Sequence, residues 1–264
     1  MKDNELKILT KEVTELARTV GYSIKQEMQK VGESDVKEKR NNDFVTYVDK
    51  ASEETIVQKL KSLFPEAGFI TEEGTASEEK EYTWIIDPLD GTTNFIHEIP
   101  SYSISIALRR KDKTIMGVVY EPNFDECFFS WEGQPAFLND KTIGVSDSTK
   151  LSDSLIATGF PYEKDEKLDK TLKLLKAILL QSHGIRRLGS AAIDLAYVAC
   201  GRFEGFYEAG LHSWDLAAGA FIVQQAGGKV TDFSGGENYV FGKEVLATNS
   251  AIHEEMLKTI KKNL

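Results

Sequence analysis

The chain has 264 residues, of which 41% are hydrophobic and 28% are charged, a composition typical of a soluble globular protein rather than of a fibrous or disordered one. Its formal net charge of -10 disfavours nucleic-acid and anionic-membrane partners, because both need a basic face. No apolar run approaches the roughly 20 residues that cross a bilayer, the charged N-terminus lacks the apolar segment of a signal peptide, and the 2 cysteines form no disulfide or zinc pattern. We therefore expect a cytoplasmic protein with no membrane or nucleic-acid partner.

Helices are predicted where hydrophobic residues recur at three- and four-residue spacing. These segments are 6–20, 49–65, 167–183, 213–228 and 251–264, with a further helix that opens at 189–192. Strands are predicted where apolar and polar residues alternate, or where short apolar runs are bounded by turn residues. These segments are 67–71, 82–87, 101–110, 114–122, 126–133, 155–160, 205–210, 228–233 and 244–249, with a short strand from 184. Residues 33–44 are charged and rich in turn formers, which predicts a loop.

Runs of strands flanked by helices predict a layered fold of the α+β or mixed α/β class. No internal repeat, low-complexity tract or clear linker divides the sequence, so residues 1–264 are expected to form a single unit. Possible sub-domains are 1–150, with helices and an antiparallel sheet, and 151–264, an α/β half. The helix near 165–182 is the expected seam between them.

The segment WIIDPLDGTTNF, residues 84–95, leads an apolar strand into two carboxylates. Asp87 precedes a proline, which favours an extended backbone at Asp87 and a β-turn from Asp87 to Asp90, with their Cα atoms within about 7 Å. Two carboxylates that close both stay ionised at neutral pH only when a cation lies between them. Because no His or Cys is near, Mg²⁺ is the expected cation and Mn²⁺ is an alternative.

The residues after Asp90 suit a phosphate site. Gly91 allows a sharp turn, and Thr92, Thr93 and Asn94 are helix-capping types, so a helix start here would offer free N–H groups to a phosphate. The alternative is a plain strand–turn–helix junction with a solvated acidic turn. The spacing of the two acids is one residue longer than in the D-x-D-G-T motif of aspartyl-phosphate phosphatases, which favours metal ligands over a nucleophile.

Other candidate residues are ambiguous when each is taken alone. Glu72 and Glu73 follow the strand 67–71 and also suit a charged surface. Asp215 opens a helix, where the macrodipole favours an acid whatever its role. Ser190 suits a plain helix N-cap, which is also compatible with N–H groups that face a ligand.

Taken together and in order, the segments TEE, WIIDPLDGTTNF and EAGLHSWDLAAGAFIVQQAGG resemble the inositol monophosphatase family. This family lies within a larger group of metal-dependent, lithium-sensitive phosphatases that includes fructose-1,6-bisphosphatase. The resemblance extends from DFVTYVD to VLATN and so covers essentially the whole chain. It implies a layered α-β-α-β-α sandwich of the sugar-phosphatase type, a site for two to three Mg²⁺ ions, and a homodimer.

The resemblance also implies a role for each matching residue. The implied metal ligands are Glu72, Asp87, the Leu89 carbonyl, Asp90 and Asp215. The implied catalytic residues are Glu72, and Thr92 supported by Asp49, which should orient the attacking water. The implied substrate-binding residues are Gly91 and Thr92 at the phosphate, and Gly189, Ser190, Ala191, Glu208 and Asp215 at the hydroxyl-bearing part.

Two positions depart from the family pattern. Thr71 stands where many members have glycine, and it precedes the ligand Glu72, so little effect on metal binding is expected. A lysine that members often carry upstream of DFVTYVD corresponds to Lys37 or Lys39, and its role is left open.

We therefore expect Mg²⁺-dependent hydrolysis of a small phosphomonoester, inositol 1-phosphate first, by a metal-activated water. One alternative is a related phosphatase that acts on a sugar phosphate, fructose-1,6-bisphosphate, NADP or histidinol phosphate. That choice depends on loops such as 159–167. An alternative of another class is a non-catalytic binding protein on the same fold.

Overall fold

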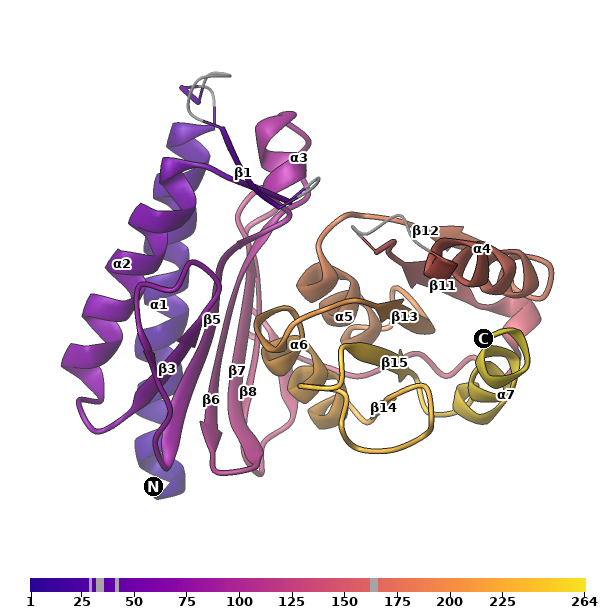
Figure 1. Ribbon diagram of the computed structural model, residues 1–264. Helices are drawn as coiled ribbons and strands as arrows, with labels where there is room; N and C mark the ends of the chain where they lie inside the picture. The colour runs from indigo at the N-terminus through magenta and orange to yellow at the C-terminus, as the bar shows by residue number, and fades with distance from the viewer. Residues whose placement is uncertain (29, 32–35, 41–42, 162–165) are drawn as a thin grey trace.

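The computed structural model describes residues 1–264 except 29, 32–35, 41–42 and 162–165, together with the side chains outside 37–44 and 166–167. Five layers cross the molecule: helices, a large sheet, a second layer of helices, a smaller sheet and a third layer of helices (Figure 1). This arrangement confirms the expected α-β-α-β-α sandwich of mixed α/β class.

The larger sheet carries the predicted meander. Its strands are β3 (Gly68–Thr71), β4 (Ser77–Glu78), β5 (Tyr82–Asp90), β6 (Ser103–Arg110), β7 (Lys113–Glu121), β8 (Glu126–Trp131), β9 (Ala136–Leu138) and β10 (Lys141–Ile143). They follow the order β10-β9-β8-β7-β6-β5-β3-β4, in which β3 and β5 are parallel and the other neighbours are antiparallel. Trp84 and Ile86 of β5 face one hydrophobic core and Ile85 faces another, so β5 is buried on both sides.

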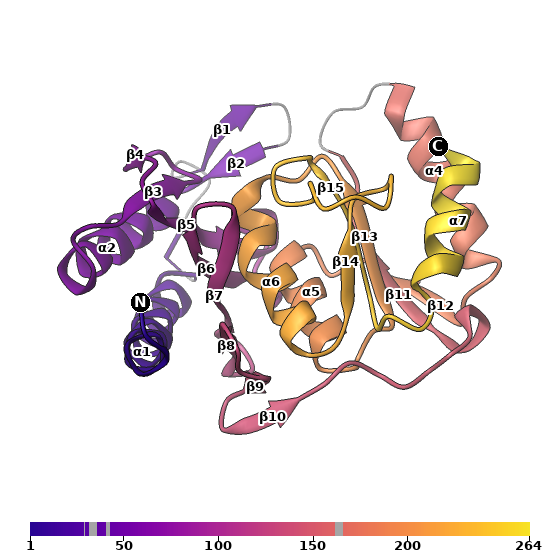
Figure 2. The ribbon, with the colours of Figure 1, turned by 90° about the horizontal axis from the view of Figure 1, so that it is seen from below.

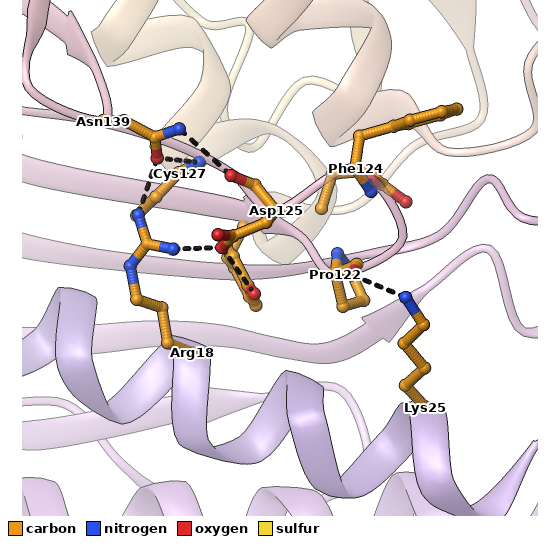
Figure 3. Close-up of polar contacts among 9 residues, drawn as sticks. Arg18, Lys25, Pro122, Phe124, Asp125, Cys127 and Asn139 are labelled. Atoms are coloured by element: carbon orange, nitrogen blue, oxygen red, sulfur yellow. Dashed lines mark hydrogen bonds and ion pairs between the residues drawn. The ribbon is translucent and has the colours of Figure 1, made fainter.

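Two long helices, α1 (Asp3–Glu27) and α2 (Tyr47–Leu63), cover the outer face of this sheet. Their apolar stripes pack on the sheet as the three- and four-residue spacing predicts. Polar contacts also join α1 to two turns of the sheet (Figure 3). Arg18 pairs with Asp125 in the turn between β7 and β8, and it donates to Asn139 Oδ1 at 2.6 Å in the turn between β9 and β10. The position of α1 on the sheet is therefore fixed by both apolar and polar contacts.

The helices α5 (Ala191–Ala199) and α6 (Ser213–Gln225) form the middle layer, between the two sheets (Figure 2). Both are apolar over most of their surface, which is the composition expected of a helix with a sheet on each side. Among the described residues, no helix is both long enough and apolar enough to cross a membrane.

The smaller sheet has five strands in the order β12-β11-β13-β15-β14. These strands are β11 (Leu155–Thr158), β12 (Gly184–Arg186), β13 (Gly205–Ala209), β14 (Lys229–Thr231) and β15 (Glu244–Thr248). The helices α4 (Glu166–Leu179) and α7 (His253–Asn263) pack on its outer face around a third hydrophobic core.

The chain passes from the larger sheet to the smaller one through the extended segment 144–150, which runs along one side of the molecule (Figure 2). Hydrogen bonds tie this segment to the second half of the chain. Val145 N donates to Ala226 O at 3.1 Å, and Asn249 Nδ2 donates to Ser146 Oγ at 3.1 Å and Ser148 O at 2.7 Å. The connection is therefore packed against the fold along its length.

The structure differs from two expectations. The predicted loop 33–44 contains the strand β1 (Lys37–Arg40) and most of β2 (Asp43–Val45), which pair antiparallel, because backbone hydrogen bonds between strands do not require apolar side chains. The side chains of Lys37 and Lys39 lie outside the described set. The second difference is the seam: α4 packs beside α7 at the outer face, and the layer between the sheets is made of α5 and α6 instead.

Candidate active site

The acidic motif lies at the C-terminal end of β5 in the larger sheet. Asp87 pairs with Ser105 and Asp90 pairs with Ser103 on β6, so three steps along β5 face two along β6, as in a β-bulge. The predicted β-turn from Asp87 to Asp90 is therefore wrong: β5 continues to Asp90 because β6 continues to pair with it. The bulge still brings the two carboxyls onto the same side of the sheet end.

Three carboxyls meet at this point. One oxygen each of Asp87, Asp90 and Asp215 lie within 4.8 Å of one another. Asp215 comes from the first turn of α6, where its Oδ2 accepts the His212 backbone N–H at 2.6 Å. The Oδ1 atom of Asp87 accepts the Leu89 N–H at 2.9 Å. Each carboxyl is thus held in place while an oxygen faces the other two.

The carboxyls of the cluster repel one another when they are ionised. Desolvation raises the pKa of Asp87 well above its usual value, and the neighbouring Glu72, Asp90 and Asp215 raise it further. Desolvation followed by the charge of Asp90 raises the pKa of Asp215 in the same way. Negative oxygens at this spacing are the hard donor set that Mg²⁺ prefers, so these residues fit such an ion.

Asp90 is held from the second half of the chain. Its Oδ2 accepts hydrogen bonds from Ser190 Oγ at 2.6 Å and from the Ala192 N–H at 2.7 Å, at the start of α5. Ser190 also caps α5, because its Oγ accepts the Ile193 N–H at 3.2 Å. Desolvation raises the pKa of Asp90 to about 6, although these two hydrogen bonds act in the opposite direction. The contact brings Ser190 and Ala191 to the edge of the acidic cluster.

Thr92 begins the short helix α3 (Thr92–Ile96) beside the cluster. Its Oγ1 lies 3.0 Å from Asp49 Oδ1 and 3.0 Å from the Leu89 carbonyl. Asp49 is buried in the first turn of α2, where its other oxygen accepts the Thr46 N–H at 2.8 Å and completes the helix cap. The predicted pair of Thr92 and Asp49 is therefore in hydrogen-bond contact.

Gly91 and Gly189 approach each other next to Thr92. Gly91 has a φ of 100°, and a side chain there would place its Cβ 3.1 Å from Ser101 O and 3.2 Å from Gly189 O. Asn94 Nδ2 holds the two loops together by donating to Ser101 O at 2.6 Å and Leu188 O at 2.7 Å. Gly189 has a φ of 97°, and a Cβ there would lie 2.6 Å from Asn94 Nδ2, so both positions favour glycine.

Glu72 follows β3, next to the parallel strand β5. Its N–H donates to Ile86 O at 3.2 Å, and its carboxyl shares a hydrogen bond with Asp87. The loop that follows is fixed by Glu53 of α2, a fully buried residue whose carboxylate accepts the Glu73 N–H at 2.8 Å and the Thr75 N–H at 2.9 Å. Sequence analysis missed Glu53. Its signal was its spacing of four residues from Asp49, which puts both acids on one face of α2.

Glu208 lies near the C-terminal end of β13 in the smaller sheet, beyond the acidic cluster. Desolvation raises the pKa of Glu208 to about 8, against the attraction of Arg187 and with a contribution from the charge of Asp90. A carboxyl with this pKa keeps its proton near neutral pH, so it can donate as well as accept a hydrogen bond.

Sequence analysis also missed Asp194, a buried acid of α5. Desolvation raises the pKa of Asp194 well above its usual value, and the charge of Glu208 raises it further. Its Oδ1 has no hydrogen-bond partner among the described residues. No sequence signal separates Asp194 from an ordinary helix residue.

Comparisons with known proteins agree with this geometry. The profile described as the inositol monophosphatase family matches residues 5–264. An inositol-1-monophosphatase of Mesorhizobium japonicum is 39% identical over 254 residues, which are 96% of each chain. Nus factor SuhB of Escherichia coli is 40% identical over 250 residues, 94% of each chain. The crystal structure of extragenic suppressor protein SuhB from Bartonella henselae has a TM-score of 0.91 at 38% identity, and the match covers 97% of this chain and all of that one.

Proposed function

This chain belongs to the inositol monophosphatase family, and from that premise we propose that it hydrolyses a small phosphomonoester with the help of Mg²⁺. The observation that carries the proposal is the group of Asp87, Asp90 and Asp215 oxygens within 4.8 Å of one another, whose repulsion a divalent ion would relieve. The leading substrate is inositol 1-phosphate, and the products are inositol and phosphate.

The residues proposed to hold two to three Mg²⁺ ions are Glu72, Asp87, Asp90 and Asp215 with the Leu89 carbonyl, and Mn²⁺ is a further candidate. When bound there, a divalent ion supplies positive charge beside the phosphoryl group and lowers the pKa of a bound water. Ser190 and the Ala192 N–H keep Asp90 in position, and Glu53 keeps the loop of Glu72 in position.

Thr92 is proposed to orient the water that attacks phosphorus. When its hydroxyl donates to Asp49 Oδ1, 3.0 Å away, the lone pairs of Oγ1 are available to accept a hydrogen bond from that water. The neighbouring N–H groups at Gly91 and Thr92 are proposed to bind phosphate oxygens. Glu72, whose carboxyl shares a hydrogen bond with Asp87, is proposed as a further catalytic residue.

The hydroxyl-bearing part of the substrate is proposed to lie between the start of α5 and the end of β13. Gly189, Ser190 and Ala191 are proposed to contact it from one side, with Glu208 and Asp215 as the carboxyls that it meets. A carboxyl is suited to the hydroxyls of a polyol. Inhibition by Li⁺, a homodimeric assembly and a place in the cytoplasm belong to the same proposal.

The experiment that tests this function is a phosphate-release assay on inositol phosphates, sugar phosphates, fructose-1,6-bisphosphate, NADP and histidinol phosphate, with Mg²⁺ and with a chelator. We expect release from inositol 1-phosphate that depends on Mg²⁺. Faster release from another compound of the panel would identify that compound as the better substrate and favour the related phosphatase activity. Equal release with chelator would contradict the metal-dependent mechanism.

A second candidate is a role in which the same fold binds a partner rather than a substrate. It is favoured by the relatives of this length and identity that carry the name Nus factor SuhB. The complete set of Glu72, Asp87, Asp90, Thr92 and Asp215 favours the enzyme. Absence of phosphate release from every compound of the panel at saturating Mg²⁺ would favour the binding role instead.

A further inference from the structure

The carboxyl of Glu208 occupies the space in which residue 159 would carry a side chain. A Cβ atom built on Gly159 would lie 2.1 Å from each Glu208 carboxyl oxygen and 2.2 Å from Glu208 Cδ. A carbon atom cannot approach another non-bonded heavy atom so closely, since optimal contacts are near 3.5–4.0 Å. Glu208 can therefore keep its position only because residue 159 is glycine.

The strand register makes this contact a fixed one. The parallel strands β11 and β13 pair Ile156 with Gly205 and Thr158 with Tyr207, so Gly159 is the next residue along beside Glu208. Thr158 Oγ1 donates to Tyr207 O at 2.8 Å and ties the end of β11 to β13. The backbone of residue 159 cannot move away without breaking this attachment.

The Glu208 side chain has no comparable attachment of its own. Among the described residues, no donor makes a hydrogen bond to its carboxyl, and its interactions are electrostatic ones with Arg187, Asp90, Asp194, Asp215 and Tyr207. The carboxyl lies at the end of a flexible side chain, so a methyl group at residue 159 would displace it at small cost to the fold. The position of this carboxyl therefore depends on the space that the missing side chain of Gly159 leaves.

We propose that Gly159 is a positioning residue for substrate specificity, because its lack of a side chain lets the Glu208 carboxyl reach the hydroxyl-bearing part of a polyol phosphate. The inference rests on the proposed function, in which Glu208 contacts the substrate. The three atoms nearest to a Cβ at residue 159 all belong to the Glu208 carboxyl, so a side chain there would act first on this group. It should therefore alter the choice between substrates rather than the hydrolysis step.

The test compares Gly159→Ala with the wild type on inositol 1-phosphate and on an aryl phosphate that has no hydroxyl groups. One lost hydrogen bond corresponds to a fall of up to about tenfold in kcat/KM. We expect the ratio of the two kcat/KM values to fall about tenfold, mainly through a higher KM for inositol 1-phosphate. The control is Gly144→Ala, because a Cβ there lies 3.7 Å from Ala226 O and meets only ordinary contact. The control should keep the wild-type ratio.

A double-mutant cycle separates an effect through Glu208 from a general disturbance. In a Glu208→Ala background, Gly159→Ala should cause no further change in the ratio, since the displaced carboxyl is already absent. An undiminished effect in that background, or equal losses on both substrates, would overturn the inference.

Crystal structures of the wild type and Gly159→Ala provide a readout that does not depend on activity. The Glu208 carboxyl should be displaced in the variant, and an unchanged position would also overturn the inference. Failure of the proposed function has a different signature: the wild type itself would release phosphate from neither substrate.

Discussion

Asp90 and Glu208 are carboxyls at the ends of strands in different sheets, and they are held in different ways. Asp90 accepts two hydrogen bonds, at 2.6 and 2.7 Å, and desolvation raises its pKa only to about 6. Glu208 lies against Gly159 without a donor among the described residues, and desolvation raises its pKa to about 8. Donors hold the Asp90 carboxyl in place and lower its pKa, whereas Glu208 depends on the space beside Gly159 for its position. Changes at Asp90 should therefore affect metal binding, and changes at Glu208 should affect selectivity.

The most severe test of this contrast is Asp90→Asn. Loss of one carboxylate from the cluster should lower Mg²⁺-dependent phosphate release at least about 100-fold, because even residues that only support metal ligands contribute up to that factor. Initial rates across a Mg²⁺ series measure the effect. Asp140→Asn, at an exposed acid outside the site, is the matched control and should retain full activity. Near-wild-type turnover of Asp90→Asn at saturating Mg²⁺ would contradict the assignment of Asp90.

The protonation of Asp90 should make Mg²⁺ binding dependent on pH. Because the pKa of this carboxyl is raised to about 6, protons compete with the ion as the pH falls through that value. Affinity measured by calorimetry should decrease as the pH falls through 6, by about tenfold per pH unit for each proton displaced. An affinity that is equal at pH 5 and pH 8 would show that the carboxyl is already ionised in the metal-free protein.

Glu72 is a third case, because Glu53 fixes the loop that follows Glu72 rather than the Glu72 carboxyl itself. Glu53→Gln replaces an acceptor of the Glu73 and Thr75 N–H groups by an amide that accepts through one oxygen only. The Mg²⁺ concentration for half-maximal phosphate release should rise about tenfold. Hydrogen exchange at the amides of residues 73 and 75 should accelerate.

The matched control for that change is Glu54→Gln, which alters the exposed neighbour on α2 and should leave both measurements unchanged. If Glu53→Gln accelerates exchange but leaves Mg²⁺ dependence intact, then the loop does not position Glu72 for the ion.

The smallest expected effect concerns stability. Since the folded pKa of Glu208 lies above its usual value of 4.5, the folded state binds an extra proton between pH 4.5 and 8, and it loses stability as the pH rises through this range. Glu208→Gln removes this dependence, so in chelator its melting temperature should decline less with pH than that of the wild type. Each kcal/mol corresponds to about 2–4 °C for a chain of this size. Parallel curves for the two proteins would refute the raised pKa.

Much of this fold follows from local patterns in the sequence. The apolar spacing of α1, α2 and α7 and the alternation in β6–β8 depend only on neighbouring residues, which is why these helices and the meander were predicted. The approach of Asp215 to Asp87 and Asp90 was predicted from the family resemblance, because no local pattern relates residues that far apart.

The features that sequence analysis missed depend on contacts between distant segments. The bulge at Asp87–Asp90 exists because β6 continues to pair there. The hydrogen bonds that Glu53 accepts from Glu73 and Thr75 form only because the loop 73–75 lies beside α2. Gly159 was assigned only to the end of a predicted strand, because the carboxyl that fills its side-chain space comes from a parallel strand 49 residues later. The position of α4 is set by the core it shares with α7, which its own amphipathic pattern does not reveal.

The extended connection 144–150 limits how this protein moves. Its hydrogen bonds from Val145 to the end of α6 and from Asn249 to Ser146 and Ser148 fasten it to the second half of the chain. A hinge needs a segment whose backbone angles are free to change, and this segment is fastened. A pivot inside 144–150 would have to break these hydrogen bonds, so a relative motion of the two sheets would have to pivot outside this connection.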